Sequence, residues 1–282
     1  GLSSFVILGE DDPMIPDIQK VIQIIRETAE TLITPRFRQL NEGQVREKSP
    51  GDLVTIADIE AEKRLEAELT SLIPGSLVVG EEEAEDFPDV INRLKEEAPV
   101  WVLDPLDGTR NFAGGREPFA VIVAYCQAGE TLMGWIHDPM VGETIWAVKG
   151  EGCWINDKRL LLGTPPPLAG MKGSLSGRVA KRLKGIKGAP TDIGRVGCVG
   201  RDYMDLALGR LDFARYAFQL KPWDHAAGVL LYTEAGGISH LIKEDREYHP
   251  DLTPEKARKA DEVLMLAPDM ERLMAISGML NN

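Results

Sequence analysis

Apolar residues in the first part of the chain recur every three to four positions. In the stretch "DIQKVIQIIRETAETLITPRF" they would share one face of a helix. The stretch "TIADIEAEKRLEAELTSLIPG" predicts a second helix, which ends at Pro74 and Gly75. The apolar face of the first helix consists of Ile18, Val21, Ile22, Ile25, Ala29, Leu32 and Ile33.

The pattern then shortens to strand-like runs. "SLVVGEEE" reads as a strand that continues into an acidic loop, and "APVWVLDPLDGT" as a short buried strand that continues into a turn. From Phe119 onward, the runs "FAVIVAYCQ", "TLMGWIHD" and "ETIWAVKG" are separated by turn signals. These runs predict an antiparallel meander.

Helices and strands alternate again in the second half of the chain. Loops rich in Pro, Gly and Lys over about 163–190 are the predicted boundary between two halves. Beyond them we expect a helix at about 200–208, a strand near 212–218 and a closing helix at about 269–279. Between the last two lie a nearly all-apolar helix in "DHAAGVLLYTEAGG" and the strands "ISHLI" and "VLMLA".

Hairpin runs with interspersed helices predict an α+β fold rather than a doubly wound parallel sheet. We expect a flexible leader at 1–15, an N-terminal α+β half at 16–162 and a C-terminal α/β half at 163–282, the two halves forming one unit. The leader's apolar run "FVIL" is too short for a signal-peptide core or a membrane span.

The composition of the chain limits the classes of molecule that could be its main partner. The 282 residues carry a net charge of −13, which argues against a nucleic-acid polymer or an anionic membrane as the main partner. A small anionic substrate is compatible with this charge, because metal ions reverse the local field of an acidic site. The three cysteines are widely spaced and form no zinc motif, which predicts a reduced, cytoplasmic setting.

Carboxylates stand at four places where a predicted strand ends or a predicted helix begins. Each has an ordinary structural interpretation: Thr55-x-x-Asp58 matches a helix capping box, "GEEE" a solvated loop, "DPLDGT" a turn, and "WDH" a helix N-cap. The residues concerned are Asp58, Glu81, Glu82, Asp104, Asp107 and Asp224.

The functional interpretation is that these carboxylates converge on metal ions. Hard divalent cations take oxygen ligands, and two such ions about 3.5–4 Å apart can hold a phosphate and lower the pKa of a bound water. In "DPLDGT", proline would stiffen the turn so that Asp104 and Asp107 face the metals, with the Leu106 carbonyl between them. Gly108 and Thr109 would begin a helix whose free N–H groups suit a phosphate.

Two stretches resemble the signature motifs of the inositol monophosphatase family: "WVLDPLDGTRNF" at 101–112 and "PWDHAAG" at 222–228. "VVGEEE", "SPGDLVTIAD" and "EAGG" resemble further elements of that family, in the same order, over about residues 17–280. The resemblance implies a five-layered αβαβα sandwich with two mainly antiparallel sheets. It also implies Mg²⁺-dependent, lithium-sensitive hydrolysis of a small phosphorylated metabolite, and a homodimer.

The resemblance also implies a role for each matched residue. One Mg²⁺ would be held by Glu81, Asp104 and the Leu106 carbonyl, and a second by Asp104, Asp107 and Asp224. Glu82 would support a third, weaker site through water, so that two or three ions are expected. Thr109 and Asp58, with Glu81, would act on the attacking water, and the Gly108 and Thr109 amides would contact the phosphate beside Asp107 and Asp224.

The sequence departs from the family pattern where the substrate would bind. Inositol-specific members carry a glutamate seven residues before the second signature aspartate, and this chain has Ala217 there. The family's Gly-Thr-Ala stretch reads "GCV" at 197–199. Arg215 or Lys221 could meet a second anionic group, although both also fit solvated surface cations.

The alternatives on this fold are therefore a 3′(2′),5′-bisphosphate nucleotidase, a fructose-1,6-bisphosphatase, a histidinol-phosphatase, or a regulatory protein that acts by binding a partner. Loss of a metal ligand would have favoured the last of these, and every matched ligand is present.

Overall fold

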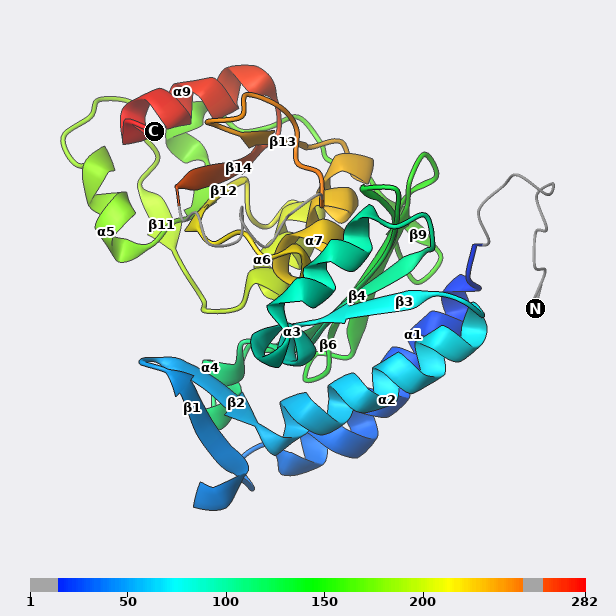
Figure 1. Cartoon of the computed structure of the whole chain (residues 1–282). Helices are drawn as coiled ribbons and strands as arrows, with labels where there is room; N and C mark the ends of the chain where they lie inside the picture. The colour runs from blue at the N-terminus through cyan, green and yellow to red at the C-terminus, as the bar shows by residue number, and fades with distance from the viewer. Residues whose placement is uncertain (1–14, 251–260) are drawn as a thin grey trace.

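A computed structural model describes residues 15–250 and 261–282, so residues 1–14 of the predicted leader lie outside the described residues. Figure 1 shows an α+β fold in five layers, which run from α9 through two sheets to the pair α1 and α2. The helices are α1 (Ile18–Thr28), α2 (Ile56–Leu72), α3 (Glu81–Asp86), α4 (Thr109–Ala113), α5 (Gly177–Ala180), α6 (Val199–Ala207), α7 (Pro222–Glu234) and α9 (Met270–Leu280).

The larger sheet has seven strands in the order β3-β4-β5-β6-β7-β8-β9. Its β3–β4 pair is parallel and all its other pairs are antiparallel, which confirms the predicted meander of β5 to β7; β4, β8 and β9 continue the antiparallel pairing on either side of it. Its strands are β3 (Leu77–Gly80), β4 (Val100–Asp107), β5 (Ala120–Gln127), β6 (Glu130–Asp138), β7 (Glu143–Val148), β8 (Gly152–Ile155) and β9 (Lys158–Leu160).

The smaller sheet is mixed rather than mainly antiparallel. Its order is β11-β10-β12-β14-β13, and β10 pairs in parallel with both of its neighbours. Helices α5 and α6 lie in the connections between these strands, and such crossovers are what parallel pairing needs. The strands are β10 (Lys172–Ser174), β11 (Asp192–Gly194), β12 (Phe213–Phe218), β13 (Ile238–Leu241) and β14 (Glu262–Ala267).

Both faces of the larger sheet are covered, which explains why all eight residues of β4 are buried. Val100 and Val102 pack into the core that contains α6 and α7. Trp101 and Leu103 point the opposite way and pack against α1 and α2. The alternation along the strand thus joins two separate cores in one element.

The middle layer, α6 and α7, lies between the two sheets. Ala226 and Leu231 of α7 share a core with β4 on one side and with Leu264 of β14 on the other. This double coverage accounts for the nearly all-apolar sequence of the helix. A third core joins the outer face of the smaller sheet to α5 and α9 through Phe213 and Leu273, among others.

Three local predictions need correction. The predicted first helix ends at Thr28 and continues as a π-helical turn over Ala29–Ile33. The acidic stretch after β3 is a helix, α3, and not a loop, because carboxylates in a first turn interact favourably with the helix dipole. An unpredicted hairpin of β1 (Val45–Ser49) and β2 (Asp52–Thr55) precedes α2.

The division into halves at about residue 163 remains a prediction. In the described parts of the chain, no helix is long and apolar enough to cross a membrane.

Candidate active site

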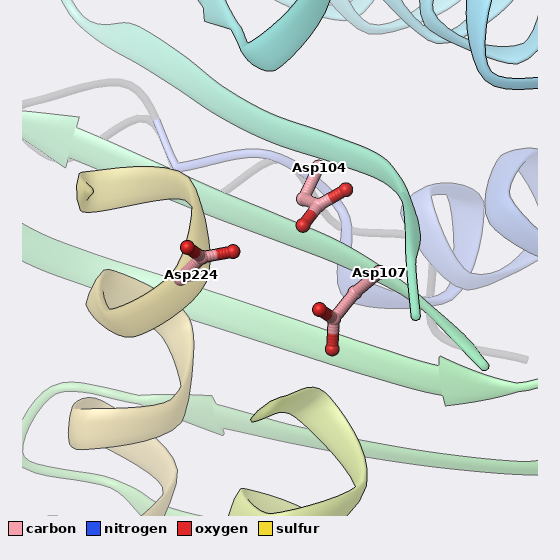
Figure 2. Close-up of side chains that lie close together, drawn as sticks. All are labelled: Asp104, Asp107 and Asp224. Atoms are coloured by element: carbon pink, nitrogen blue, oxygen red, sulfur yellow. The ribbon is translucent and has the colours of Figure 1, made fainter. Parts of the chain in front are cut away.

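The motif "DPLDGT" lies mostly within strand β4 rather than in a turn that follows it. The β4–β5 pairing shifts between Asp104, opposite Ile122, and Asp107, opposite Ala120. Three steps along β4 therefore face two steps along β5, which is an irregularity of the β-bulge kind. In a regular strand, residues three apart point to opposite faces. The extra residue brings Asp104 and Asp107 to the same side, as Figure 2 shows.

Asp224 reaches these two aspartates from helix α7. It is the third residue of the helix and not its N-cap, which is Lys221. One carboxylate oxygen each from Asp104, Asp107 and Asp224 lies within 4.8 Å of the other two. Figure 2 shows the three side chains pointing toward one another from β4 and α7. The predicted convergence of these three carboxylates is therefore present in the structure.

Glu81 and Glu82 enter from the first turn of α3, at the end of strand β3. The Glu81 carboxyl lies against that of Asp104, within hydrogen-bonding reach. Oxygen Oε2 of Glu81 is buried and has no hydrogen-bond partner among the described residues. Buried polar atoms normally have a partner, so this oxygen points to a ligand.

The electrostatics of the cluster lead to the same conclusion. Burial, together with the neighbouring Asp224, raises the pKa of Asp107 to about 7. Burial raises the pKa of Asp224 to about 6, and it holds the pKa values of Glu81 and Asp104 well above their usual range. Several buried carboxylates in contact are unfavourable unless a cation neutralises them. This all-oxygen donor set fits Mg²⁺ or another hard divalent ion.

Lys48 on β1 is a neighbour of the cluster that the sequence reasoning missed. Its ammonium lies 3.5 Å from Glu82 and 4.0 Å from Glu81. Burial alone would lower the pKa of Lys48, but the two glutamates outweigh it and raise this pKa above its usual value. The sequence signal was weak, since Lys48 stands one residue before the family-like "SPGDLVTIAD".

Asp58 takes part in the predicted capping box and also contacts Thr109. Its Oδ2 accepts hydrogen bonds from the Thr55 backbone N–H at 2.8 Å and from the Thr55 hydroxyl at 2.6 Å, which confirms the capping box. Its Oδ1 accepts from the Thr109 hydroxyl at 2.8 Å. Thr109 is also 2.9 Å from the Leu106 carbonyl oxygen. Thus Thr109 joins Asp58 to the carbonyl predicted as a metal ligand.

Asp107 is fixed from behind by the start of α6. Its Oδ2 accepts from the Gly200 N–H at 2.6 Å and from the Cys198 thiol at 3.1 Å. Cys198 is the central residue of the "GCV" stretch, and the sequence reasoning gave it no role. Gly108, between Asp107 and α4, adopts φ +86°, and a Cβ there would lie 2.9 Å from the Pro118 carbonyl oxygen. Only glycine fits this position without strain.

A cavity of about 330 Å³ opens beside Glu81 and Asp224. Lys221 lines it, whereas Arg215 lies elsewhere and donates to Asn282 at 2.7 Å. Ala217 is not among the lining residues. The full lining comprises Lys48, Asp52, Glu81, Ala84, Glu85, Pro88, Ile91, Gln219, Lys221, Trp223 and Asp224.

The sequence and structure were compared with those of known proteins. Residues 16–271 match the model of the inositol monophosphatase family. An inositol-1-monophosphatase of Caulobacter vibrioides is 34% identical over 79% of this chain and 89% of its own length. A fructose-1,6-bisphosphatase/inositol-1-monophosphatase of Thermotoga maritima is 31% identical over 68% of this chain and 73% of its own.

A further relative, the Nus factor SuhB of Pseudomonas aeruginosa, is 33% identical over 80% of this chain and 85% of its own. The fold is also that of a solved IMPase of Thermotoga maritima, with a TM-score of 0.74 at 22% identity over 92% of this chain and 96% of that one. The match to the family model and the identity to these relatives show that this chain belongs to the inositol monophosphatase family.

Proposed function

We propose that this protein hydrolyses small phosphate monoesters with Mg²⁺ bound at the carboxylate cluster. The observation that carries the proposal is the meeting of Asp104, Asp107 and Asp224 within 4.8 Å, with Glu81 against Asp104. Bound Mg²⁺ would supply charge neutralisation, polarisation of the phosphate oxygens and a more acidic water. Two or three ions would be held by Glu81, Asp104, the Leu106 carbonyl, Asp107 and Asp224, with Glu82 at the weakest site.

Asp58 and Thr109 would direct the attacking water. A hydroxyl has one proton, and in this structure both Asp58 and the Leu106 carbonyl are within reach of it. With the carbonyl occupied as a metal ligand, the Thr109 proton would be donated to Asp58. The lone pairs of Thr109 would then accept a hydrogen bond from the attacking water and orient it. The N–H groups of Gly108 and Thr109 would hold the phosphate.

A phosphate-release assay tests the proposal directly. The purified protein should release phosphate from inositol, sugar and polyol monophosphates with Mg²⁺, and lose this activity in EDTA. Lithium should inhibit at sub-saturating Mg²⁺. Absence of phosphate release from every substrate in Mg²⁺ would refute the proposal, and would favour a regulatory protein that acts by binding a partner.

A second candidate, a bisphosphatase activity, is favoured by Lys221. This lysine lines the cavity together with Asp224 and forms no ion pair with any described residue. It lies over the Trp223 ring at 5.8 Å. An unpaired cation near a phosphate site suits a second anionic group. The same phosphate-release assay with fructose-1,6-bisphosphate and with an adenosine bisphosphate as substrates would identify this activity.

We further propose that the protein works as a homodimer in the cytoplasm, on the strength of the family resemblance. Sedimentation equilibrium of the purified protein tests the dimer, and a single species of monomer mass would contradict it.

A further inference from the structure

Helix α3 begins without a capping side chain of its own. Its N-cap is Gly80, which cannot accept a hydrogen bond through a side chain. The first N–H groups of a helix have no partner within the helix and are usually satisfied by the N-cap residue. In α3 the acceptor comes from a different helix.

That acceptor is Glu62 of α2, a carboxylate only 6% exposed. Its Oε1 accepts from the Glu82 N–H at 2.9 Å, and its Oε2 accepts from the Glu83 N–H at 2.9 Å. One carboxylate therefore satisfies two successive N–H groups, one with each oxygen. Burial raises the pKa of Glu62 to about 7, so the carboxyl is ionised above that pH, where its hydrogen bonds to the two N–H groups are charge-assisted and stronger than neutral ones.

Gly80 leaves the space that the Glu62 carboxyl occupies. A Cβ at residue 80 would lie 2.5 Å from Glu62 Cδ and 2.6 Å from Glu62 Oε1. The backbone of Gly80 has φ −107°, which any residue can adopt, so its conformation does not demand glycine. The close approach of the Glu62 carboxyl is what excludes a larger residue.

The turn held by Glu62 directs three glutamates to three separate partners. Glu81 lies against Asp104. Glu82 lies 3.5 Å from the Lys48 ammonium. Glu83 forms an ion pair with Arg93 at 3.3 Å. A small rotation of this turn would move the first two away from the carboxylate cluster.

We propose that Glu62 is a positioning residue of the metal site: by capping the first turn of α3, it fixes the directions in which Glu81 and Glu82 present their carboxylates to Mg²⁺. This inference rests on the proposed function, because it assigns those two glutamates to the metal. Groups that orient metal ligands from behind typically contribute about 10- to 100-fold to metal affinity.

The test is a calorimetric titration of Mg²⁺ alone into the parent, Glu62→Gln and Gly80→Ala. Glutamine keeps the size of the side chain but can accept only one of the two N–H bonds. The alanine methyl would push the Glu62 carboxyl from its place. Both variants should bind Mg²⁺ about 10- to 100-fold more weakly. Their activation by Mg²⁺ should shift by the same factor, with kcat recovering at saturating Mg²⁺.

Glu66→Gln is the matched control. Glu66 lies one turn further along α2, is half-buried, and its side chain makes no hydrogen bond with the described residues. The Glu66→Gln variant should bind Mg²⁺ with the same affinity as the parent. All four proteins are compared at a temperature where circular dichroism shows them folded.

The outcomes separate the two proposals. Parental Mg²⁺ affinity in both Glu62→Gln and Gly80→Ala, even with lower thermal midpoints, would reduce Glu62 to a structural cap and overturn the inference alone. A parent protein that neither binds Mg²⁺ nor releases phosphate would overturn the proposed function and this inference with it.

Discussion

Two groups of buried carboxylates lie side by side in this site and differ in how their oxygens are satisfied. Asp58 is fully buried, yet both of its oxygens accept hydrogen bonds, from Thr55 and Thr109. Asp104 is equally buried but lies among other acids, and Glu81 beside it has an oxygen without a partner.

The difference separates two kinds of function. The oxygens of Asp58 are satisfied by donors, so this carboxylate can orient the Thr109 hydroxyl without an added cation, although burial still raises its pKa. Carboxylates that face one another are stable only with added positive charge. Under the proposed function, Asp58 would be the proton-handling part of the site and the cluster its cation-binding part, and substitutions should affect the two differently.

The largest effect should follow from disabling the cation-binding part. EDTA, or the substitution Asp224→Asn, should reduce kcat/KM by about 10³-fold or more, because a catalytic metal supplies several kcal/mol of charge stabilisation. Without metal, however, Asp224→Asn should not lower the thermal midpoint at pH 8, since it removes one of several repelling charges. A variant of near-parental activity would contradict the cluster as the metal site.

Disabling the proton-handling part should also reduce turnover, but without loss of metal. Asp58→Asn and Thr109→Ala should lower kcat by about 10²- to 10⁴-fold, the usual contribution of a positioned proton acceptor. Calorimetric Mg²⁺ affinity should stay near that of the parent. As the N3 member of the capping box alone, Asp58→Asn would cost little stability, because the amide oxygen of Asn can still accept from the Thr55 N–H. A folded Asp58→Asn enzyme with nearly parental kcat would leave Asp58 with only the capping role.

The two lysines that line the cavity also differ in whether their charge is satisfied by a partner. Lys48 is paired with Glu81 and Glu82, whereas Lys221 has no ion pair among the described residues. Lys221→Gln should therefore raise KM for a bisphosphate by about 10-fold, since a hydrogen bond to a charged group contributes about 1.5–3 kcal/mol. KM for a monophosphate should change little. Equal changes in KM for the bisphosphate and the monophosphate would show that Lys221 does not contact a second anionic group.

The smallest expected effect is the change of folding stability with pH in the metal-free protein. The pKa values of Asp107 and Asp224 are raised in the folded state to about 7 and about 6, above those of ordinary aspartates. The folded state therefore binds more protons than the unfolded state between about pH 4 and pH 7, and stability falls as pH rises through this range. The thermal midpoint in EDTA should drop by a few degrees, and saturating Mg²⁺ should abolish the drop. Burial lowers the pKa of His137 to about 4 and that of His225 to about 3, and these two groups act in the opposite direction in both conditions. A midpoint in EDTA that does not fall relative to the midpoint in Mg²⁺ over this interval would therefore contradict the raised pKa values of the aspartates.

Much of the fold follows from periodicity in the sequence. The three-to-four spacing from Ile18 predicted α1, and the strand runs from Phe119 predicted the antiparallel strands β5 to β7. The acidic stretch at Glu81 was interpreted as a loop because glycine and three glutamates carry no helical apolar pattern. The first turn of this helix is capped by Glu62, which lies 20 and 21 residues before the two N–H groups that it accepts from, and no local pattern reveals this acceptor.

The candidate site was also only partly predictable, because local motifs name residues but not their geometry or their distant neighbours. The motifs around Asp104 and Asp224 named carboxylates that the structure brings together. The local interpretation of each was wrong in geometry: a bulged strand replaces the turn, and a third helical position replaces the N-cap. Lys48, Cys198 and Glu62 were missed, because each touches the site through a neighbour distant in sequence.

The sequence by itself determined the chemistry available to this protein: oxygen ligands suited to Mg²⁺, a threonine and aspartate for water, and the family that these motifs indicate. Only the tertiary structure decided how these groups are used. It brings Asp224 to Asp104 across the chain, leaves Lys221 but not Ala217 or Arg215 on the cavity wall, and places Glu62 under α3. The physical reason is that residue type fixes what a side chain can bind, whereas burial, distance and unpaired charge arise only when separate elements pack together.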